Sequence, residues 1–192
     1  MYEGFYGLQE RPFALLPDPS FLYLSKGHST ALTLLRYSIL NRQGFTVVSG
    51  EVGSGKTTLI NRLLDEMKAG MTVGLINFTT RSFGDMAEWI MMAYGLPYKG
   101  KGKVELYDDF VQFMIREYAA GRPVVLIVDE AQNLGIRGLE EIRMLSNVNA
   151  QKDYLLHVIL VGQPELRSLL QSPQLRQLTQ LGFELACLPY EA

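Results

Sequence analysis

The chain has 192 residues with 18 basic and 20 acidic side chains, and 47% of its residues are hydrophobic. This composition predicts one globular domain, or one domain with a small appendage, and excludes a mainly disordered chain. A single cysteine and two histidines far apart in sequence exclude a disulfide framework and a histidine or cysteine metal cluster, and a net charge of −2 does not favour strong nonspecific binding to nucleic acid. The longest apolar run is much shorter than the ~20 residues of a membrane span, and the first residues lack the pattern of a signal peptide, so we expect a cytoplasmic chain.

The start of the chain is rich in prolines and aromatic residues, which disfavour a long helix and predict an ordered arm laid over a core. Apolar residues at helical spacing then predict a helix over residues 29–40, with Ser29 or Thr30 as its cap. We therefore divide the chain into an arm with the first helix, residues 1–44, and a core, residues 45–192.

Short β-branched or apolar runs alternate with helical patterns through the rest of the chain. The predicted strands span residues 45–49, 72–77, 124–129, 156–161 and 183–188. The predicted helices span residues 57–67, 83–94, 106–120, 139–148, 164–170 and 174–180. Apolar strands separated by amphipathic helices are typical of a parallel sheet covered on both faces, so we predict an α/β fold.

A glycine-rich loop joins the first of these strands to a helix. Residues 50–57, GEVGSGKT, match the pattern G-x-x-x-x-G-K-[ST] of a phosphate-binding loop, the Walker A motif. Glycines let the loop curl so that backbone N–H groups point inward, and the helix N-terminus adds positive partial charge beneath the phosphates. We predict that Lys56 contacts the β- and γ-phosphates, that the Thr57 hydroxyl ligates Mg²⁺, and that Thr58 contacts the α-phosphate. The predicted nucleotide-binding residues are Gly50, Glu51, Val52, Gly53, Ser54, Gly55, Lys56, Thr57 and Thr58.

Two adjacent carboxylates end the apolar strand 124–129. This pattern indicates a Walker B motif, in which Asp129 holds the water shell of Mg²⁺ and Glu130 polarises a water molecule for attack on the γ-phosphate. Adjacent acids at this place favour hydrolysis over transfer to a bound acceptor, which argues against a small-molecule kinase.

A polar amide follows the strand 156–161. If this strand lies between the Walker A and Walker B strands, Gln163 reaches the γ-phosphate and reports its presence, which is the sensor 1 role. The alternative is that Gln163 only caps the helix that begins at Pro164.

Several strings beyond these motifs are informative. They include DEAQ at residues 129–132, LEEIRMLSN at 139–147, VGQPEL at 161–166 and LRQL at 175–178. Together with the phosphate loop and the PDPSFLYL segment at 17–24, they resemble the secretion-pathway protein A group of AAA+ ATPases, and the resemblance covers nearly the whole chain.

The resemblance implies a P-loop NTPase of the AAA+ type that binds ATP or ADP with Mg²⁺ and works as a homo-oligomer, with an arginine from the neighbouring subunit completing the site. In the family this arginine lies in a string similar to LRQLxQR. Arg176 matches its first arginine, whereas Leu181 stands where the second would be, so Arg176 is the candidate. Arg143 and Arg167 are expected to be surface or helix-packing charges.

Two further expectations come from the same resemblance. AAA+ proteins normally add a helical lid, and this sequence ends about where a lid begins, so we expect a core without a lid. The family places residues 17–24 and His28 near the adenine and ribose, while the alternative for His28 is a histidine that packs at a helix start.

The resemblance implies that the chain is an ATPase that supports assembly of an envelope secretion or pilus apparatus. It also implies that the protein is cytoplasmic and associates with the inner membrane through partners. The alternative is a nucleotide-switched, DNA-associated regulator similar to transposition AAA+ proteins. Its support is three lysines, Lys99, Lys101 and Lys103, in a segment expected to be a mobile solvated loop or, alternatively, a phosphate-contacting one. Nucleic acid is therefore a less favoured partner.

Overall fold

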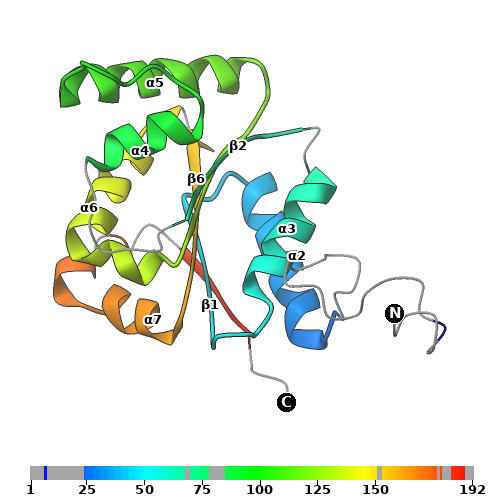
Figure 1. Cartoon of the computed structure of the whole chain (residues 1–192). Coiled ribbons are helices and arrows are strands. Elements are labelled where there is room, and N and C mark those ends of the chain that lie inside the picture. The colour runs from blue at the N-terminus through cyan, green and yellow to red at the C-terminus, as the bar shows by residue number, and fades with distance from the viewer. Residues whose placement is uncertain are drawn as a thin grey trace.

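The computed structural model describes residues 7, 24–67, 70–77, 85–150, 153–176, 178 and 183–188, with only the backbone of 183–187. A five-stranded parallel sheet forms its centre, in the order β2-β3-β6-β1-β7 (Figure 1). The strands are β1 (Phe45–Gly50), β2 (Thr72–Asn77), β3 (Val124–Asp129), β6 (Leu156–Gly162) and β7 (Phe183–Leu188). Because all five are parallel, their carboxyl ends meet at one edge of the sheet.

The helices lie on both faces of this sheet, which confirms the predicted α/β class. They are α2 (Lys26–Leu40), α3 (Lys56–Met67), α4 (Met86–Ala93), α5 (Lys103–Ala119), α6 (Gly135–Ser146) and α7 (Pro164–Leu170). Figure 1 shows α2 and α3 on one face and α4 to α7 on the other. Two short 3₁₀ turns, η2 (Ala131–Leu134) and η3 (Pro173–Leu175), and a small hairpin of β4 (Asn149–Ala150) and β5 (Asp153–Tyr154) complete the described elements.

The two faces of the sheet form two separate hydrophobic cores. Successive side chains of a strand point to opposite faces, so Leu126 and Val128 of β3 join the core beneath α4 to α7, whereas Ile127 joins the core beneath α2 and α3. Each of these side chains is fully buried. This double burial explains why β3 and β6 are mostly apolar, with Asp129 at the end of β3 and the buried His157 as the exceptions, rather than alternating with polar residues.

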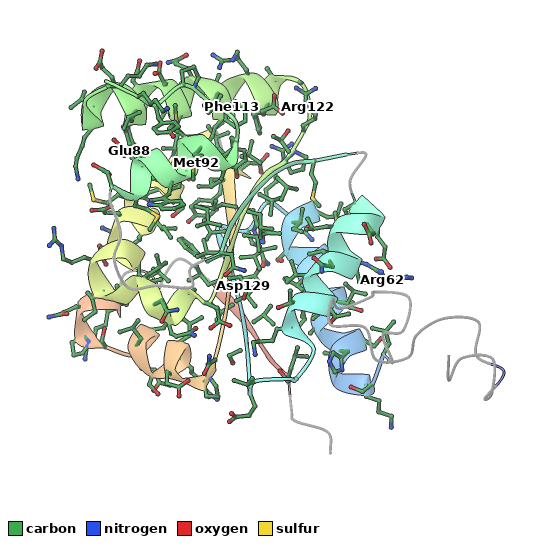
Figure 2. All side chains as sticks on the ribbon, viewed as in Figure 1. Arg62, Glu88, Met92, Phe113, Arg122 and Asp129 are labelled. Atoms are coloured by element: carbon green, nitrogen blue, oxygen red, sulfur yellow. The ribbon has the colours of Figure 1, made fainter. Side chains whose placement is uncertain are left out.

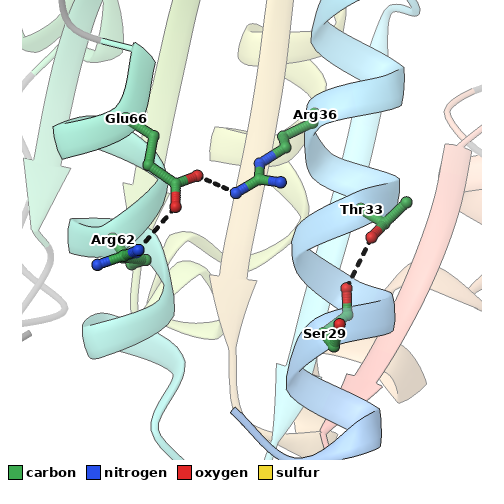
Figure 3. Close-up of polar contacts among 5 residues, drawn as sticks. All are labelled: Ser29, Thr33, Arg36, Arg62 and Glu66. Carbon is green, nitrogen blue, oxygen red and sulfur yellow. Dashed lines mark hydrogen bonds and ion pairs between the residues drawn. The ribbon is translucent and has the colours of Figure 1, made fainter. Parts of the chain in front are cut away.

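Helices α2 and α3 pack side by side and share a surface ion-pair network. Glu66 of α3 accepts hydrogen bonds from Arg36 of α2 and from Arg62 one turn earlier in α3, the latter at 2.8 Å (Figure 3). Exposed pairs of this kind stabilise a fold by at most about 1 kcal/mol each. Burial of the apolar faces of both helices is therefore the main reason that α2 stays on the core.

Most helix starts differ from the sequence-based expectation. Helix α2 begins at Lys26, and its N-cap is Ser25 rather than Ser29 or Thr30, because the Ser25 hydroxyl accepts the His28 N–H at 3.4 Å. Helices α5 and α6 begin three and four residues before the predicted starts at 106 and 139. For α5 the reason is local, since the Glu105 carboxylate accepts the Gly102 N–H at 2.9 Å and closes the first turn.

The lysine-rich segment comprises an exposed turn at Lys99 and the start of α5. Lys103 is the first residue of α5, and its ammonium lies 2.9 Å from the Asp85 carboxylate, although 72% of its side chain is exposed. Lys101 forms an ion pair with Asp109. The segment is therefore solvated as expected, and two of its three lysines have carboxylate partners.

Some expectations fall outside the described residues. Residues 1–6 and 8–23, which carry the predicted arm and all of the PDPSFLYL segment except Leu24, belong to this group. So do Gln177, the last two residues of the predicted helix 174–180, and Leu181. The part of that helix that is described comprises η3, Arg176 and Leu178. Among the described helices, none combines the length and the apolar character that a bilayer span requires.

Candidate functional site

The glycine-rich loop lies between the carboxyl end of β1 and the first residue of α3, as the motif requires. Gly53 and Gly55 both have a φ of 81°, a conformation that glycine adopts without strain. At Gly55 a side chain is excluded for a second reason, since a Cβ atom would lie 2.9 Å from Nε2 of His28. These two glycines let the backbone curl tightly above the helix N-terminus.

Lys56 is held inside this loop. Its side chain is only 7% exposed, and Nζ donates hydrogen bonds to the carbonyl oxygens of Gly50 at 2.7 Å and Glu51 at 2.8 Å. A buried ammonium with two carbonyl partners places a fixed positive charge at the mouth of the loop. The α3 N-terminus adds its partial positive charge at the same place, so the loop can bind a polyphosphate.

The Ser54 hydroxyl lies in the same loop and is buried without a hydrogen-bond partner among the described residues. A buried polar atom without a partner is destabilising, and an incoming acceptor would satisfy it. Phosphate oxygens are acceptors of this kind. The loop therefore fits a nucleotide phosphate in its geometry, in its charge and in its unsatisfied hydroxyl.

Thr57 and Asp129 face each other across the site. Thr57 Oγ1 donates to Asp129 Oδ2 at 3.3 Å, and Asp129 ends β3 between the helices of the two faces (Figure 2). Burial raises the pKa of Asp129 above its ordinary value, although the Glu130 N–H, which donates to Asp129 Oδ1 at 2.9 Å, opposes that rise.

A hydroxyl and a carboxylate are hard oxygen ligands of the type that Mg²⁺ prefers. Within the described ranges, no group of three or more His, Cys, Asp or Glu side chains could hold a metal ion. The residues present fit Mg²⁺ all the same, because this ion is usually held by one or two protein oxygens together with substrate phosphates and water.

Glu130 has an unusual backbone. Its φ of 53° and ψ of 38° lie in the left-handed region, which a residue with a side chain seldom adopts. Strain of this kind costs on the order of 1–3 kcal/mol and is concentrated at functional sites. The bend ends β3 abruptly and turns the Glu130 carboxylate toward β6, the neighbouring strand in the sheet.

Gln163 meets this carboxylate. The structure places β6 between β1 and β3, which is the arrangement that the sensor 1 role requires. Gln163 occupies the N-cap position of α7, but its side chain makes no capping hydrogen bond. Instead its Nε2 donates to Glu130 Oε2 at 3.2 Å, so the alternative of a plain helix cap does not describe the contacts of this side chain.

Gln132 is a residue of this site that the sequence motifs did not single out. Its Nε2 donates to Glu130 Oε2 at 2.5 Å, and its Oε1 accepts the backbone N–H of Gln163 at 3.2 Å. The DEAQ string contains Gln132, yet spacing alone could not show that its amide bridges two strands.

His28 lies against the phosphate loop from α2. Its Nε2 is 2.8 Å from the Ser54 carbonyl oxygen, and its Nδ1 is 2.8 Å from the Ser25 hydroxyl. Because a carbonyl oxygen can only accept, Nε2 carries a proton in this contact. His28 is buried at the start of α2, so its packing role is the one that the described contacts support.

Arg176, the candidate, and the two other arginines weighed with it lie in the second half of the chain. Arg143 donates to Glu140 at 2.8 Å one turn away on α6, and only 17% of its side chain is exposed, as expected of a helix-packing charge. Arg167 is exposed on α7. Arg176 is also exposed, directly after η3.

Comparison with known proteins gives two kinds of match. A family described as an AAA domain matches residues 39–170 of the chain. The general secretion pathway protein A of Aeromonas hydrophila is 39% identical over 181 residues, which are 94% of this chain and 33% of that protein. This chain therefore spans about a third of the length of that relative.

Solved structures match in fold at much lower identity. The Aeropyrum pernix ORC1 protein in complex with DNA has a TM-score of 0.65 at 19% identity, over 93% of this chain and 49% of that chain. The Aeropyrum pernix ORC2 protein in its ADPNP and ADP complexes has a TM-score of 0.64 at 19% identity, over 92% of this chain and 50% of that chain. At this identity the likeness concerns the arrangement of strands and helices only.

Proposed function

Because the chain belongs to the family of AAA domains, we propose that it binds ATP together with Mg²⁺ and hydrolyses the bond to the γ-phosphate. The observation that carries the proposal is a convergence of side chains. The phosphate loop, the Asp129–Glu130 pair and Gln163 stand at the carboxyl ends of the neighbouring strands β1, β3 and β6, where Thr57 contacts Asp129 and Gln163 contacts Glu130. This is the edge at which parallel α/β sheets bind their ligands.

Each side chain has a distinct part in the proposed reaction. Lys56 neutralises charge on the β- and γ-phosphates, and Thr57 and Asp129 hold Mg²⁺, which supplies further charge neutralisation when it is bound. Glu130 accepts a proton from the attacking water as the water oxygen bonds to phosphorus and the bond to the β-phosphate oxygen breaks. Gln163 donates to a γ-phosphate oxygen.

The proposal is tested by identifying the nucleotide that the protein retains. The wild-type chain and Glu130→Gln are each mixed with radiolabelled ATP and Mg²⁺ and freed of unbound nucleotide by rapid filtration. The bound label should be largely ADP in the wild type and ATP in the variant, because the amide cannot take the proton from water. Equal conversion in both proteins would remove Glu130 from the reaction.

We also propose that the active site lies at an interface between copies of the chain and that Arg176 acts in the neighbouring site. The exposure of Arg176 supports this assignment, since a side chain that enters a second subunit must be accessible. An arginine supplied in this way can raise turnover by ~10³-fold or more. Mixing Arg176→Ala with Lys56→Ala chains should then restore activity that neither variant has alone, whereas no restoration would remove Arg176.

The cellular role is proposed from the secretion-protein relative. We propose that the chain is an ATPase module for assembly of an envelope secretion or pilus apparatus and acts in the cytoplasm next to the inner membrane through its partners. Genomic replacement by Glu130→Gln should block secretion or piliation while the protein accumulates to its normal level. Normal export and normal pili in that strain would contradict the role.

The DNA-associated alternative has less support in this chain. Two of its three lysines, Lys101 and Lys103, form ion pairs with carboxylates, and paired cations release fewer counterions from a phosphate backbone. Binding to duplex DNA at low salt that disappears when the three lysines are replaced would revive it.

A further inference from the structure

The amide of Gln132 bridges the two residues that the proposed reaction needs at the γ-phosphate. Its Nε2 donates to Glu130 Oε2 and its Oε1 accepts the Gln163 N–H. Only one orientation of the amide satisfies both contacts, because the reverse orientation would set oxygen against carboxylate and N–H against N–H. The N–H side of the amide therefore faces Glu130 at the end of β3, and its oxygen faces Gln163 at the end of β6.

The backbone around the bridge is shaped for it. A Cβ atom on Gly162, the last residue of β6, would lie 2.5 Å from Gln132 Oε1, closer than any real contact. Because Gly162 has no side chain, there is room for the Gln132 amide to lie against β6. On the other side, the left-handed conformation of Glu130 brings its carboxylate within 2.5 Å of Gln132 Nε2.

Two amide donors share one carboxylate oxygen in this arrangement. Both Gln132 Nε2 and Gln163 Nε2 reach Glu130 Oε2, at 2.5 and 3.2 Å. Hydrogen bonds to a charged acceptor are the stronger kind, and two of them on one oxygen fix the rotation of the carboxylate. When Gln163 engages a γ-phosphate, the contact from Gln132 keeps Glu130 in place.

We propose that Gln132 is a positioning residue that holds the Glu130 carboxylate in the orientation needed to take a proton from the attacking water. It acts through Glu130 and touches neither nucleotide nor metal. The inference rests on the proposed ATP hydrolysis and adds to it a residue that determines the rate of the chemical step and not the affinity for ATP.

The test compares steady-state kinetics of the wild-type chain, Gln132→Met and Gln112→Met. Methionine keeps the length of the side chain but has no N–H or C=O, and the exposed Gln112 on α5 serves as the matched control. Gln132→Met should lower kcat roughly tenfold or more while KM and the affinity for a non-hydrolysable ATP analogue stay within about twofold of the wild type. Gln112→Met should behave as the wild type.

A double variant separates positioning from general loss of structure. If Gln132 acts only through Glu130, adding Gln132→Met to Glu130→Gln should not lower the residual kcat further.

Three results would overturn the inference: an unchanged kcat in Gln132→Met, a change confined to KM, or a further loss of kcat in the double variant. Failure of the proposed function looks different. In that case the wild-type chain itself binds ATP without turning it over, and the role of Gln132 falls with it. If the wild type hydrolyses ATP and Gln132→Met is equally active, only the positioning role of Gln132 is excluded, and the proposed ATP hydrolysis stands.

Discussion

Thr57 and Asp129 are 72 residues apart in sequence, and the hydroxyl of the first donates to the carboxylate of the second at 3.3 Å. This contact joins the first turn of α3 to the end of β3, two elements that approach each other only because β6 and β1 follow β3 in the sheet. The two oxygen atoms that we assign to Mg²⁺ are thus already next to each other in the folded chain.

This contact predicts a metal-dependent effect at Thr57. Thr57→Val keeps the shape of the side chain but removes the hydroxyl, so ATP affinity in the presence of Mg²⁺ should fall roughly tenfold, with little change when EDTA replaces the metal. Thr58→Val is the matched control, because we assign Thr58 to the α-phosphate and expect its loss to weaken binding equally with and without Mg²⁺. Titration calorimetry measures both affinities. An effect of Thr57→Val that ignores the metal would contradict the assignment.

Lys56 should be essential for nucleotide binding. Removing its buried ammonium by Lys56→Ala takes away the fixed positive charge of the phosphate loop and should weaken ATP binding roughly 10- to 100-fold. Lys26→Ala, at the exposed start of α2, removes a lysine that lies outside the loop and should leave the affinity unchanged. Equal affinities of the two variants for a fluorescent ATP analogue would show that Lys56 does not contact phosphate.

The contact between His28 and the phosphate loop predicts that α2 stabilises the nucleotide site. His28→Leu leaves the Ser54 carbonyl and the Ser25 hydroxyl without this partner, which should lower the free energy of unfolding by about 1–3 kcal/mol and weaken ATP binding as well. Ser29→Ala, on the exposed side of the same helix, should change neither quantity. Urea unfolding with and without ATP provides the measurement. An unchanged ATP affinity in His28→Leu would show that α2 does not stabilise the nucleotide site.

His157 should make stability fall in mild acid. Burial lowers the pKa of His157 to about 4, in a cluster where its Nδ1 contacts the Gln43 carbonyl and its Nε2 lies near the Thr46 and Ser38 hydroxyls. The unfolded chain, with an ordinary pKa of about 6.5, takes up the proton first. Stability that is fully present above pH 6.5 is therefore lost as the pH falls toward 4, by about 3 kcal/mol in total.

The matched variant for this prediction is His157→Gln, which retains an N–H donor for the Gln43 carbonyl but does not titrate. The difference in unfolding free energy between the two proteins should change between pH 6.5 and pH 4 and stay level above that range. A constant difference across the range would show that the folded protein does not exclude the proton from His157.

The sequence predicted the strands better than the helix starts. Bounds for β2, β3 and β7 agree with the structure, and β1 and β6 each extend only one residue further than predicted. Helix α2 begins three residues before the predicted start because Ser25, outside the periodic pattern, caps it through contacts with His28. Apolar periodicity cannot reveal such a cap when the first turn is polar.

The candidate site divides in the same way. Thr57 contacts Asp129 and Gln163 contacts Glu130, since each of these residues belongs to a motif at the carboxyl end of a parallel strand, and such ends share one edge. The roles of Gln132 and Gly162 could not be predicted, because they depend on the left-handed turn at Glu130 and on how closely η2 approaches β6.

Steady-state ATP turnover per chain is the measurement that decides whether the chain hydrolyses ATP at a site completed between copies. It is measured over a wide range of protein concentration for the wild type, Glu130→Gln and Lys56→Ala. We expect turnover per chain to rise with concentration in the wild type, as sites are completed between copies, and to stay far below the wild-type value in both variants. Wild-type turnover no higher than that of Glu130→Gln at every concentration, in protein that binds ATP, would contradict it.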